Sequence, residues 1–288
     1  MKTLVIGGTG TVGSQVVKEL LARKSEVYVF TRNAEKIKGL PGGTIAVEGD
    51  LVDPGALKSA MHGVDRVFML LAVSRNETQQ GIVAIDCARM AGVEYFVYMS
   101  VQNVYEGAHV PHFGSKIPME LVLKSSGMPY TILRPNNFYQ NDLGSKDSLL
   151  RDGIYPQPIG DAGLSRVDVR DIAEAAAITL TKPGRRGRIY NIVGPRVYTG
   201  TSCAEVWSRA LGRPVAYGGD DLDAWEKRVS KDLPAWKVFD YRLMYEYLQK
   251  EGLLADDGDV ERLTELLGHP PRTFEDFARE TAALWTGR

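Results

Sequence analysis

The chain has 288 residues, which is enough for one large α/β domain with a smaller appendage. Its 35 basic and 36 acidic side chains nearly cancel, so no net positive field attracts nucleic acid, and 44% of the residues are hydrophobic, as in ordinary globular proteins. No apolar run is long enough for a signal peptide or for the ~20 residues of a membrane span. The two cysteines, Cys87 and Cys203, lack the spacing of a disulfide framework or a metal site. We therefore expect a cytoplasmic protein that binds no metal, no nucleic acid and no membrane.

The first half of the chain alternates short apolar runs with longer amphipathic segments. The runs are typical of strands buried on both faces, and they are Thr3–Ile6, Glu26–Thr31, Thr44–Val47, Arg66–Leu70, Tyr95–Met99 and Tyr130–Leu133. The helical patterns between them are Val12–Arg23, Pro54–Met61, Glu77–Ala91 and Pro118–Ser126. Repeated strand–helix–strand order predicts an α/β fold with a doubly wound parallel sheet of the Rossmann type.

The alternation stops after Arg134-Pro135. An irregular stretch to about Gly163 is followed by a helix over Ile172–Thr181 and a strand over Arg188–Val193. The remaining predicted elements are helices, at Cys203–Leu211, Leu222–Val229, Ala235–Glu251, Val260–Leu267 and Phe274–Leu284. We expect a Rossmann domain of residues 1–134 with 165–194, and a smaller, mostly helical substrate or cap domain of residues 135–164 with 195–288.

A glycine-rich loop joins the first strand to the first helix. Gly7, Gly10 and Gly13 are spaced three apart. In this position the first glycine permits a tight turn, the second lets a pyrophosphate approach the backbone, and the third allows close packing of helix on strand. The helix N-terminus then offers free N–H groups to the phosphates. The loop predicts a dinucleotide site that also includes Thr9, Thr11 and Val12.

The residues after the second strand indicate which dinucleotide binds. In NAD-preferring Rossmann proteins a carboxylate ends this strand and bonds the ribose 2′-hydroxyl. Here the strand ends in Thr31-Arg32, with Lys36 one turn beyond. A guanidinium can donate two charge-assisted hydrogen bonds to a 2′-phosphate that a carboxylate would repel. Arg32 and Lys36 therefore favour NADP(H), with NAD(H) still possible; in the alternative, Arg32 stacks on adenine or lies in solvent.

The ordered motifs resemble those of the short-chain dehydrogenase/reductase superfamily, in its atypical branch of NmrA-like and isoflavone-reductase-like proteins. The motifs that carry the resemblance, over most of the chain, are Gly7–Gly13, Thr31-Arg32, Gly49-Asp50-Leu51, Ser100-Val101, His112–Lys116, Ser126–Phe138 and Val167–Ala173. The resemblance implies that Asp50 and Leu51 flank adenine, although Asp50 also suits a turn or a helix cap. It implies further that the residues ending the fourth strand border the cofactor ribose, namely Leu70, Leu71 and Ala72.

The resemblance also implies a set of catalytic residues. Short-chain reductases carry a serine after the fifth strand and then a Tyr-x-x-x-Lys pair, in which lysine holds the nicotinamide ribose and lowers the pKa of tyrosine. Ser100 and Lys116 match the serine and the lysine, but His112 stands at the tyrosine position. If this stretch is helical, His112 and Lys116 share one face, and a histidine can donate a proton near neutral pH. A structural role for His112 is the alternative, and Tyr105 and Tyr139 are other candidate donors.

The segment that leaves the sixth strand reaches the same edge of the predicted sheet. From this edge we expect further cofactor contacts from Val101, Pro135, Asn136 and Phe138. Phe138 and Tyr139 could wall the nicotinamide or the substrate, or could pack in the core. Asp168 and Asp171 precede a helix and suit capping better than catalysis.

Two main functions fit these features. In the first, the protein is an NADPH-dependent reductase that passes hydride to a small, flat, conjugated acceptor such as a quinone, an enone or an aromatic dye. Such acceptors delocalise the charge that hydride addition creates, so their reduction can proceed with weak acid assistance and without the tyrosine. In the second, the protein is a non-catalytic NADP(H)-binding redox sensor of the NmrA type; a scaffold for complex assembly is a third reading. The retained Ser100 and Lys116 favour the reductase, as a monomer or a homodimer.

Overall fold

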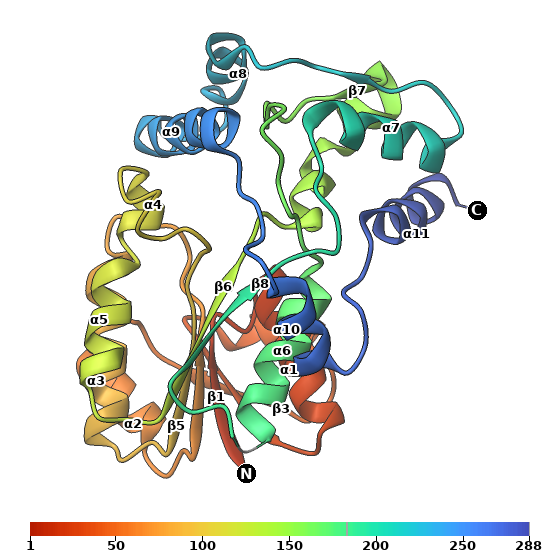
Figure 1. Ribbon diagram of the computed structural model, residues 1–288. Helices are drawn as coiled ribbons and strands as arrows, with labels where there is room; N and C mark the ends of the chain where they lie inside the picture. Colours follow the sequence, from red (N-terminus) through yellow and green to blue (C-terminus); the bar gives the residue numbers. More distant parts are fainter. Residues whose placement is uncertain (183, 288) are drawn as a thin grey trace.

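A seven-stranded parallel sheet forms the centre of the protein in a computed structural model that describes residues 1–182 and 184–287 (Figure 1). The strands are β1 (Lys2–Ile6), β2 (Glu26–Thr31), β3 (Thr44–Glu48), β4 (Arg66–Met69), β5 (Tyr95–Met99), β6 (Tyr130–Pro135) and β8 (Arg188–Ile192). Their order across the sheet is β3-β2-β1-β4-β5-β6-β8. The order reverses between β1 and β4, and ligands of open α/β sheets bind at this point. The predicted doubly wound Rossmann fold is confirmed.

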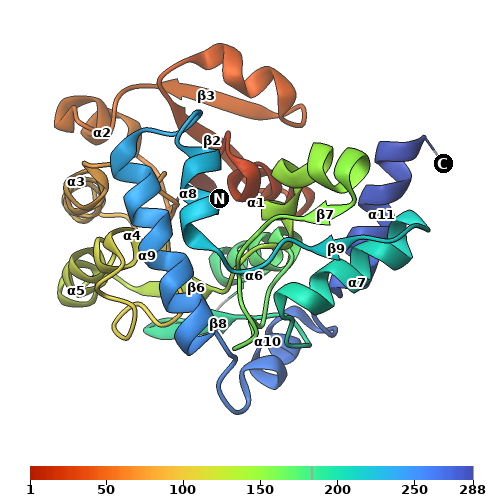
Figure 2. The same ribbon diagram turned by 90° about the horizontal axis from the view of Figure 1, so that it is seen from above.

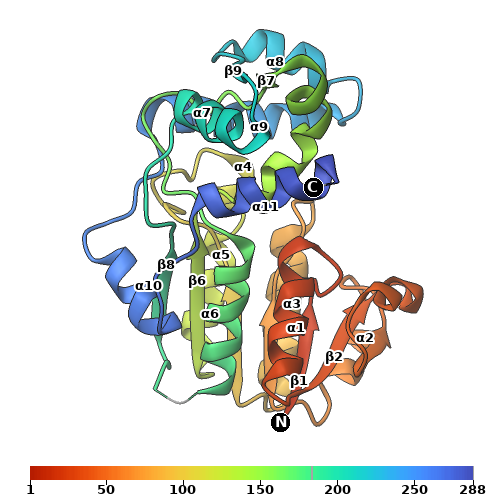
Figure 3. The same cartoon turned by 90° about the vertical axis from the view of Figure 1, so that its right-hand side faces the viewer.

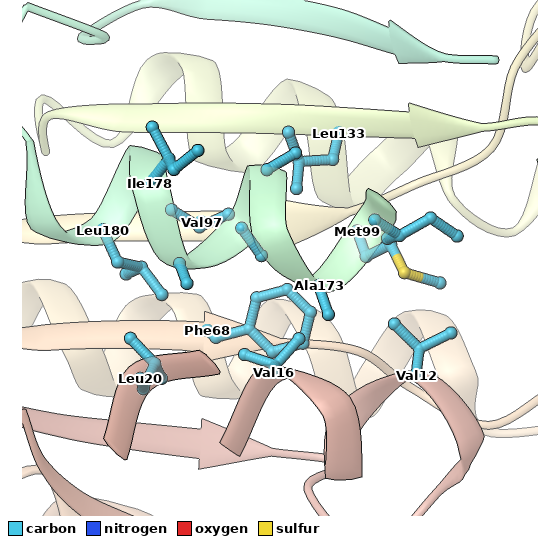
Figure 4. Packing of buried hydrophobic residues seen from close by; sticks show 14 of the residues in the cluster. Val12, Val16, Leu20, Phe68, Val97, Met99, Leu133, Ala173, Ile178 and Leu180 are labelled. Atoms are coloured by element: carbon cyan, nitrogen blue, oxygen red, sulfur yellow. The ribbon is translucent and has the colours of Figure 1, made fainter. Parts of the chain in front are cut away.

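Helices cover both faces of this sheet. On one face lie α1 (Thr11–Ala22), α6 (Val169–Thr181) and α10 (Asp259–Leu267), and on the other α2 (Pro54–Met61), α3 (Glu77–Met90) and α5 (Ile117–Ser125). Because side chains alternate along a strand, Val97 of β5 packs toward α1 and α6, while Phe96 and Tyr98 pack toward α3 and α5. Figure 4 shows the first of these cores, where side chains of α1 and α6 meet around Phe68 and Val97.

A mostly helical cap region lies at the carboxyl edge of the strands, on the side opposite the N-terminus (Figures 1 and 3). It contains a two-stranded parallel sheet, which the sequence analysis did not predict, and its elements are β7 (Ile154–Tyr155), α7 (Gly200–Leu211), β9 (Ala216–Tyr217), α8 (Leu222–Val229), α9 (Ala235–Glu251) and α11 (Phe274–Thr286). A fully buried ion pair between Arg166 and Asp142, 2.7 Å long, lies in its core, where the indole of Trp207 also donates to Asp142. Seen from above, α8 and α9 cross over the sheet (Figure 2).

The helix α10 belongs to the packing of the sheet rather than to the cap region. Its apolar face, Leu263, Leu266 and Leu267, joins the core formed by α1 and α6, and the helix packs against β8 and α6. Sequence order alone placed it with the cap, because a helix that follows other cap helices carries no local sign of where its apolar face docks. The division into two domains stays a proposal. Within the described residues, no helix is both long enough and apolar enough to cross a membrane.

Candidate active site

The glycine loop has the backbone geometry that its sequence predicts. Gly7 has a φ of +84°, and a Cβ there would lie 2.3 Å from the carbonyl oxygen of Leu70. A Cβ on Gly13 would lie 2.1 Å from the carbonyl oxygen of Gly7, so α1 can pack this closely on β1 only without a side chain. At Gly10 the nearest such atom is 3.5 Å away, and the residue is exposed. Gly7 and Gly13 therefore serve the fold, whereas Gly10 leaves the surface of the loop open.

The N-terminus of α1 is available to an anion. No side chain caps it, and its first turn contains no acidic residue. Thr9, Gly10 and Thr11 are exposed there, and the first N–H groups of a helix have no partner within the helix. The loop and the helix end therefore fit a bound pyrophosphate.

The residues expected at the adenine end follow two paired strands, β2 and β3, at the same edge of the sheet. Arg32 follows β2, is exposed, and has no hydrogen bond or ion pair within residues 1–182 and 184–287. Lys36 is exposed on the following 3-10 helix, η1 (Ala34–Gly39). The Asp50 carboxylate accepts the N–H of Val52 at 3.2 Å, so it closes a turn. Leu51 is half-buried against the core on the α2 side.

Lys116 forms a buried ion pair that sequence reasoning missed. The residue precedes α5, and its Nζ donates to Oε1 of Glu77, the first residue of α3. Their side chains are 9% and 2% exposed. The Ser115 hydroxyl donates to the other Glu77 oxygen at 3.3 Å. The one sequence signal for this pair is an acidic residue at the start of the helix after β4, and such residues are common at helix starts.

His112 pairs with a carboxylate from the cap region. It lies in the short helix α4 (Pro111–Gly114), and its Nδ1 is 2.5 Å from Oδ1 of Asp240, which is buried in α9. The same oxygen accepts the backbone N–H of His112 at 3.3 Å. Burial raises the pKa of Tyr241, the next residue of α9, and the negative charges of Asp240 and Glu77 raise it further. The Tyr241 ring also lies against His112, with the ring centroids 5.7 Å apart, and we call Glu77, His112, Lys116, Asp240 and Tyr241 the His112–Lys116 cluster.

Ser100 lies on the α5 side of the sheet. It directly follows β5 and is 2% exposed, and its hydroxyl lies beside the carboxylate of Glu120, whose pKa it helps to lower. Glu120 of α5 lies on the same side and accepts two hydrogen bonds from Arg134, at 2.6 and 2.9 Å. Burial raises the pKa of Glu120, but hydrogen bonds from Arg134, Ser100 and Lys124 outweigh burial and hold that pKa below its usual value.

Two candidate proton donors lie elsewhere. Tyr139 is fully buried among the aromatic rings of α11, with its ring centroid 5.1 Å from that of Phe274, so it does not wall a pocket. Burial also raises its pKa far above the usual value. Tyr105 is exposed and lies beside Lys124 and Arg134, away from Lys116. The sequence could not exclude either tyrosine, because both follow strands at the correct edge.

The residues after β6 are held by the protein itself. The Asn136 amide donates to Gln102 and to the carbonyl oxygen of Leu253, both at 2.7 Å. Pro135 is buried, and Phe138 is half-buried against the sheet core. Asp168 caps α6 by accepting the N–H of Arg170 at 2.8 Å, as expected. Cofactor contacts from this segment therefore stay a prediction.

Comparison with known proteins gives a consistent picture over nearly the whole chain. The NmrA-like family matches residues 1–277. An NAD(P)H azoreductase of Xenophilus azovorans is 32% identical over 284 residues, which cover 98% of each chain. Quinone oxidoreductase 2 of Escherichia coli strain K12 is 28% identical, over 94% of this chain and 96% of that protein.

Solved structures agree with these relatives. The Escherichia coli NADPH-dependent quinone oxidoreductase in complex with NADPH superposes with a TM-score of 0.87 at 25% identity, over 97% of this chain and 99% of that one. NmrA, a negative transcriptional regulator solved with NADP, shares the fold with a TM-score of 0.80 at 18% identity, over 98% of this chain and 96% of that chain. The family match and the azoreductase similarity extend over the glycine loop, the sheet and the His112–Lys116 cluster. The chain belongs to the NmrA-like family.

Proposed function

We propose that this chain is an NADPH-dependent reductase that transfers hydride to a small, flat, conjugated acceptor such as a quinone, an enone or an azo or other aromatic dye. One observation carries the proposal: Lys116 and His112, four residues apart, are each paired with a buried carboxylate at the carboxyl edge of the sheet. The full-length similarity to an NAD(P)H azoreductase and to a quinone oxidoreductase supports the acceptor class.

The cofactor is held along the carboxyl edge of the sheet. The phosphates lie against Gly7, Thr9, Gly10, Thr11, Val12 and Gly13, and Arg32 with Lys36 binds the 2′-phosphate. Further contacts come from Asp50, Leu51, Leu70, Leu71, Ala72, Val101, Pro135, Asn136 and Phe138. Lys116, oriented by Glu77, holds the nicotinamide ribose.

Bound NADPH supplies the hydride, and the chain supplies the proton and the positioning. His112 lies in the position of the tyrosine of ordinary short-chain reductases and donates the proton that a reduced quinone or azo group requires. Ser100, which directly follows β5 at the carboxyl edge of the sheet, bonds the acceptor oxygen or nitrogen. The cytoplasmic location and the monomeric or dimeric state stay predictions.

A non-catalytic NADP(H) sensor is the alternative, since NmrA shares the fold and is a transcriptional regulator. The paired His112 and Lys116 favour the reductase, because a sensor needs no proton donor beside the nicotinamide.

Steady-state kinetics test the two functions directly. The purified protein is mixed with NADPH and a panel of quinones, enones and aromatic dyes, and NADPH oxidation is followed by absorbance. A reductase oxidises NADPH with some acceptor at a rate that saturates in both substrates. If no acceptor supports oxidation and NADPH and NADP⁺ bind with markedly different affinities, the sensor is correct, because only differential binding can shift a conformational equilibrium.

A further inference from the structure

The cap helix α9 reaches the Rossmann region through one face. Trp236, Asp240 and Tyr247 recur at intervals of four and seven residues, which places them on one side of the helix. Trp236 stacks with the guanidinium of Arg75, which lies 5.6 Å from the ring centroid, in the loop before α3. The Tyr247 hydroxyl accepts a hydrogen bond from the Asn103 amide at 3.3 Å. Between these two residues of α9, Asp240 bonds His112. The cap region thus places one buried carboxylate on the only histidine of the His112–Lys116 cluster.

This hydrogen bond determines which nitrogen of His112 carries a proton. The Asp240 side chain is 4% exposed, and its carboxylate can only accept hydrogen bonds when ionised. Nδ1 therefore carries a proton toward Asp240. In the neutral ring Nε2 is then an acceptor, and it becomes a donor only when the ring is an imidazolium. Within the described residues no hydrogen bond occupies Nε2.

We propose that Asp240 is a positioning residue for the reaction: by orienting His112 and stabilising its imidazolium, it makes Nε2 the proton donor for acceptors that need a proton. The inference rests on the proposed function, because it assigns the proton in that reaction. It also gives the cap region a chemical role beyond covering the substrate.

The charges around His112 support this assignment. The titratable groups packed about it are Asp240, Tyr241 and Lys237 from α9, Glu77 from α3 and Lys116 from the start of α5. Lys116 and Glu77 neutralise each other in a direct ion pair. Lys237 lies over the ring of Tyr241, 5.5 Å from its centroid, and not on His112. Asp240 is therefore the charge in direct contact with the imidazole.

Two classes of acceptor separate proton donation from hydride transfer. A quinone is reduced as quinone + NADPH + H⁺ → hydroquinone + NADP⁺, so one proton must come from a donor. A cationic triarylmethane dye is reduced as Ar₃C⁺ + NADPH → Ar₃CH + NADP⁺, because its central carbon takes the hydride and the charge is cancelled. The first reaction needs the Nε2 proton of His112, and the second does not.

The test compares these acceptors in Asp240→Asn. Asparagine keeps the size of the side chain and an oxygen for Nδ1–H, but it removes the negative charge. We expect kcat with a naphthoquinone to fall about 10²-fold, and kcat with the cationic dye and the Kd for NADPH to keep wild-type values. Asp240→Glu should recover part of the quinone activity. Glu246→Gln is the matched control, because it removes an exposed carboxylate that pairs with Arg242 on the same helix.

The outcomes distinguish this inference from the proposed function. Equal losses with quinone and dye would mean that Asp240 is structural, and unchanged quinone kinetics would mean that it has no role; either result overturns the inference. If the wild-type protein reduces no acceptor, the proposed function fails instead. The contact that carries the inference is then checked by nitrogen NMR of the cofactor-free protein, in which the His112 ring should carry its proton on Nδ1, toward Asp240. A neutral ring with its proton on Nε2 would refute the inference.

Discussion

The phosphate loop and the His112–Lys116 cluster are built in contrasting ways. Gly7–Gly13 is one contiguous segment whose shape depends on missing side chains, and it lies between the strand and helix that it joins, with Leu70 after β4 against Gly7. The cluster draws its groups from α3, α4, the start of α5 and the cap helix α9, and His112 and Asp240 are 128 residues apart. A local motif can therefore bind a cofactor without fixing the chemistry, whereas the reaction depends on distant segments that only the complete fold brings together.

The largest effect should come from breaking the ion pair in the cluster. Lys116→Met leaves Glu77 as a buried carboxylate without its cation, so we expect the free energy of unfolding to fall by about 3–5 kcal/mol. Urea denaturation measures this change. Combining Lys116→Met with Glu77→Gln should restore most of the stability. NADPH affinity should be lower than in the wild type in both Lys116 variants, and should stay near the wild-type value in His112→Phe. A double variant as unstable as the single one would contradict the electrostatic explanation.

Substitutions at two glycines of the loop should have different effects, one on stability and the other on NADPH binding. Gly13→Ala places a Cβ against backbone atoms of Gly7, so we expect the free energy of unfolding to fall by about 3 kcal/mol. Gly10→Ala, which meets no such obstacle, should cost about 1 kcal/mol or less but weaken NADPH binding at least about tenfold, by blocking the phosphates. Thermal unfolding and calorimetry provide the two measurements. Equal destabilisation by both variants would show that the loop does not divide its roles in this way.

A charge reversal at the adenine end should have a smaller effect, on cofactor affinity. Arg32→Glu should weaken NADPH binding by about 1.5–3 kcal/mol, or one to two decades in Kd, and leave NADH binding nearly unchanged, because only NADPH carries the 2′-phosphate. Fluorescence titration with both cofactors measures the ratio. Lys227→Glu, an exposed charge reversal on α8, is the control. Equal Kd values for NADPH and NADH in the wild type would refute the preference.

The smallest effect concerns His269, a histidine outside the site. A hydrogen bond with the Pro270 carbonyl oxygen raises its pKa above the usual 6.5, burial opposes this, and a bond with Glu174 adds to it. A raised folded pKa stabilises the fold below the unfolded pKa, and this stability is lost as pH rises through the folded pKa. The side chain is 39% exposed, so solvent weakens this effect. We expect the free energy of unfolding of the wild type to exceed that of His269→Gln by less than about 1 kcal/mol in acid, and the two values to be equal in alkali.

Urea denaturation at several pH values measures this difference. His269→Gln should leave kcat for quinone reduction unchanged, in contrast to Asp240→Asn. A fall in that kcat would show that His269 also takes part in the reaction.

The sequence by itself determined the Rossmann sheet, the glycine loop and the approximate bounds of the long helices, but not the small sheet of β7 and β9 or the short helix α4. The period of apolar residues marks strands and helices directly, and glycines are required where a Cβ would strike backbone, as at Gly7 and Gly13. The position of Ser100 after β5 and the spacing of His112 and Lys116 follow from the same local order.

Only the tertiary structure decided the partners of these residues. Glu77 and Asp240 are ordinary helix acids in the sequence, and they become partners of Lys116 and His112 because α3 and α9 pack at the same edge of the sheet. The same holds for α10, which docks on β8, and for Tyr139, which is buried in the aromatic core of the cap region. Sequence periodicity reports which face of an element is apolar, but it carries no information on which distant surface that face will cover. Hydrogen bonds and ion pairs between distant segments form only where this packing brings their side chains together.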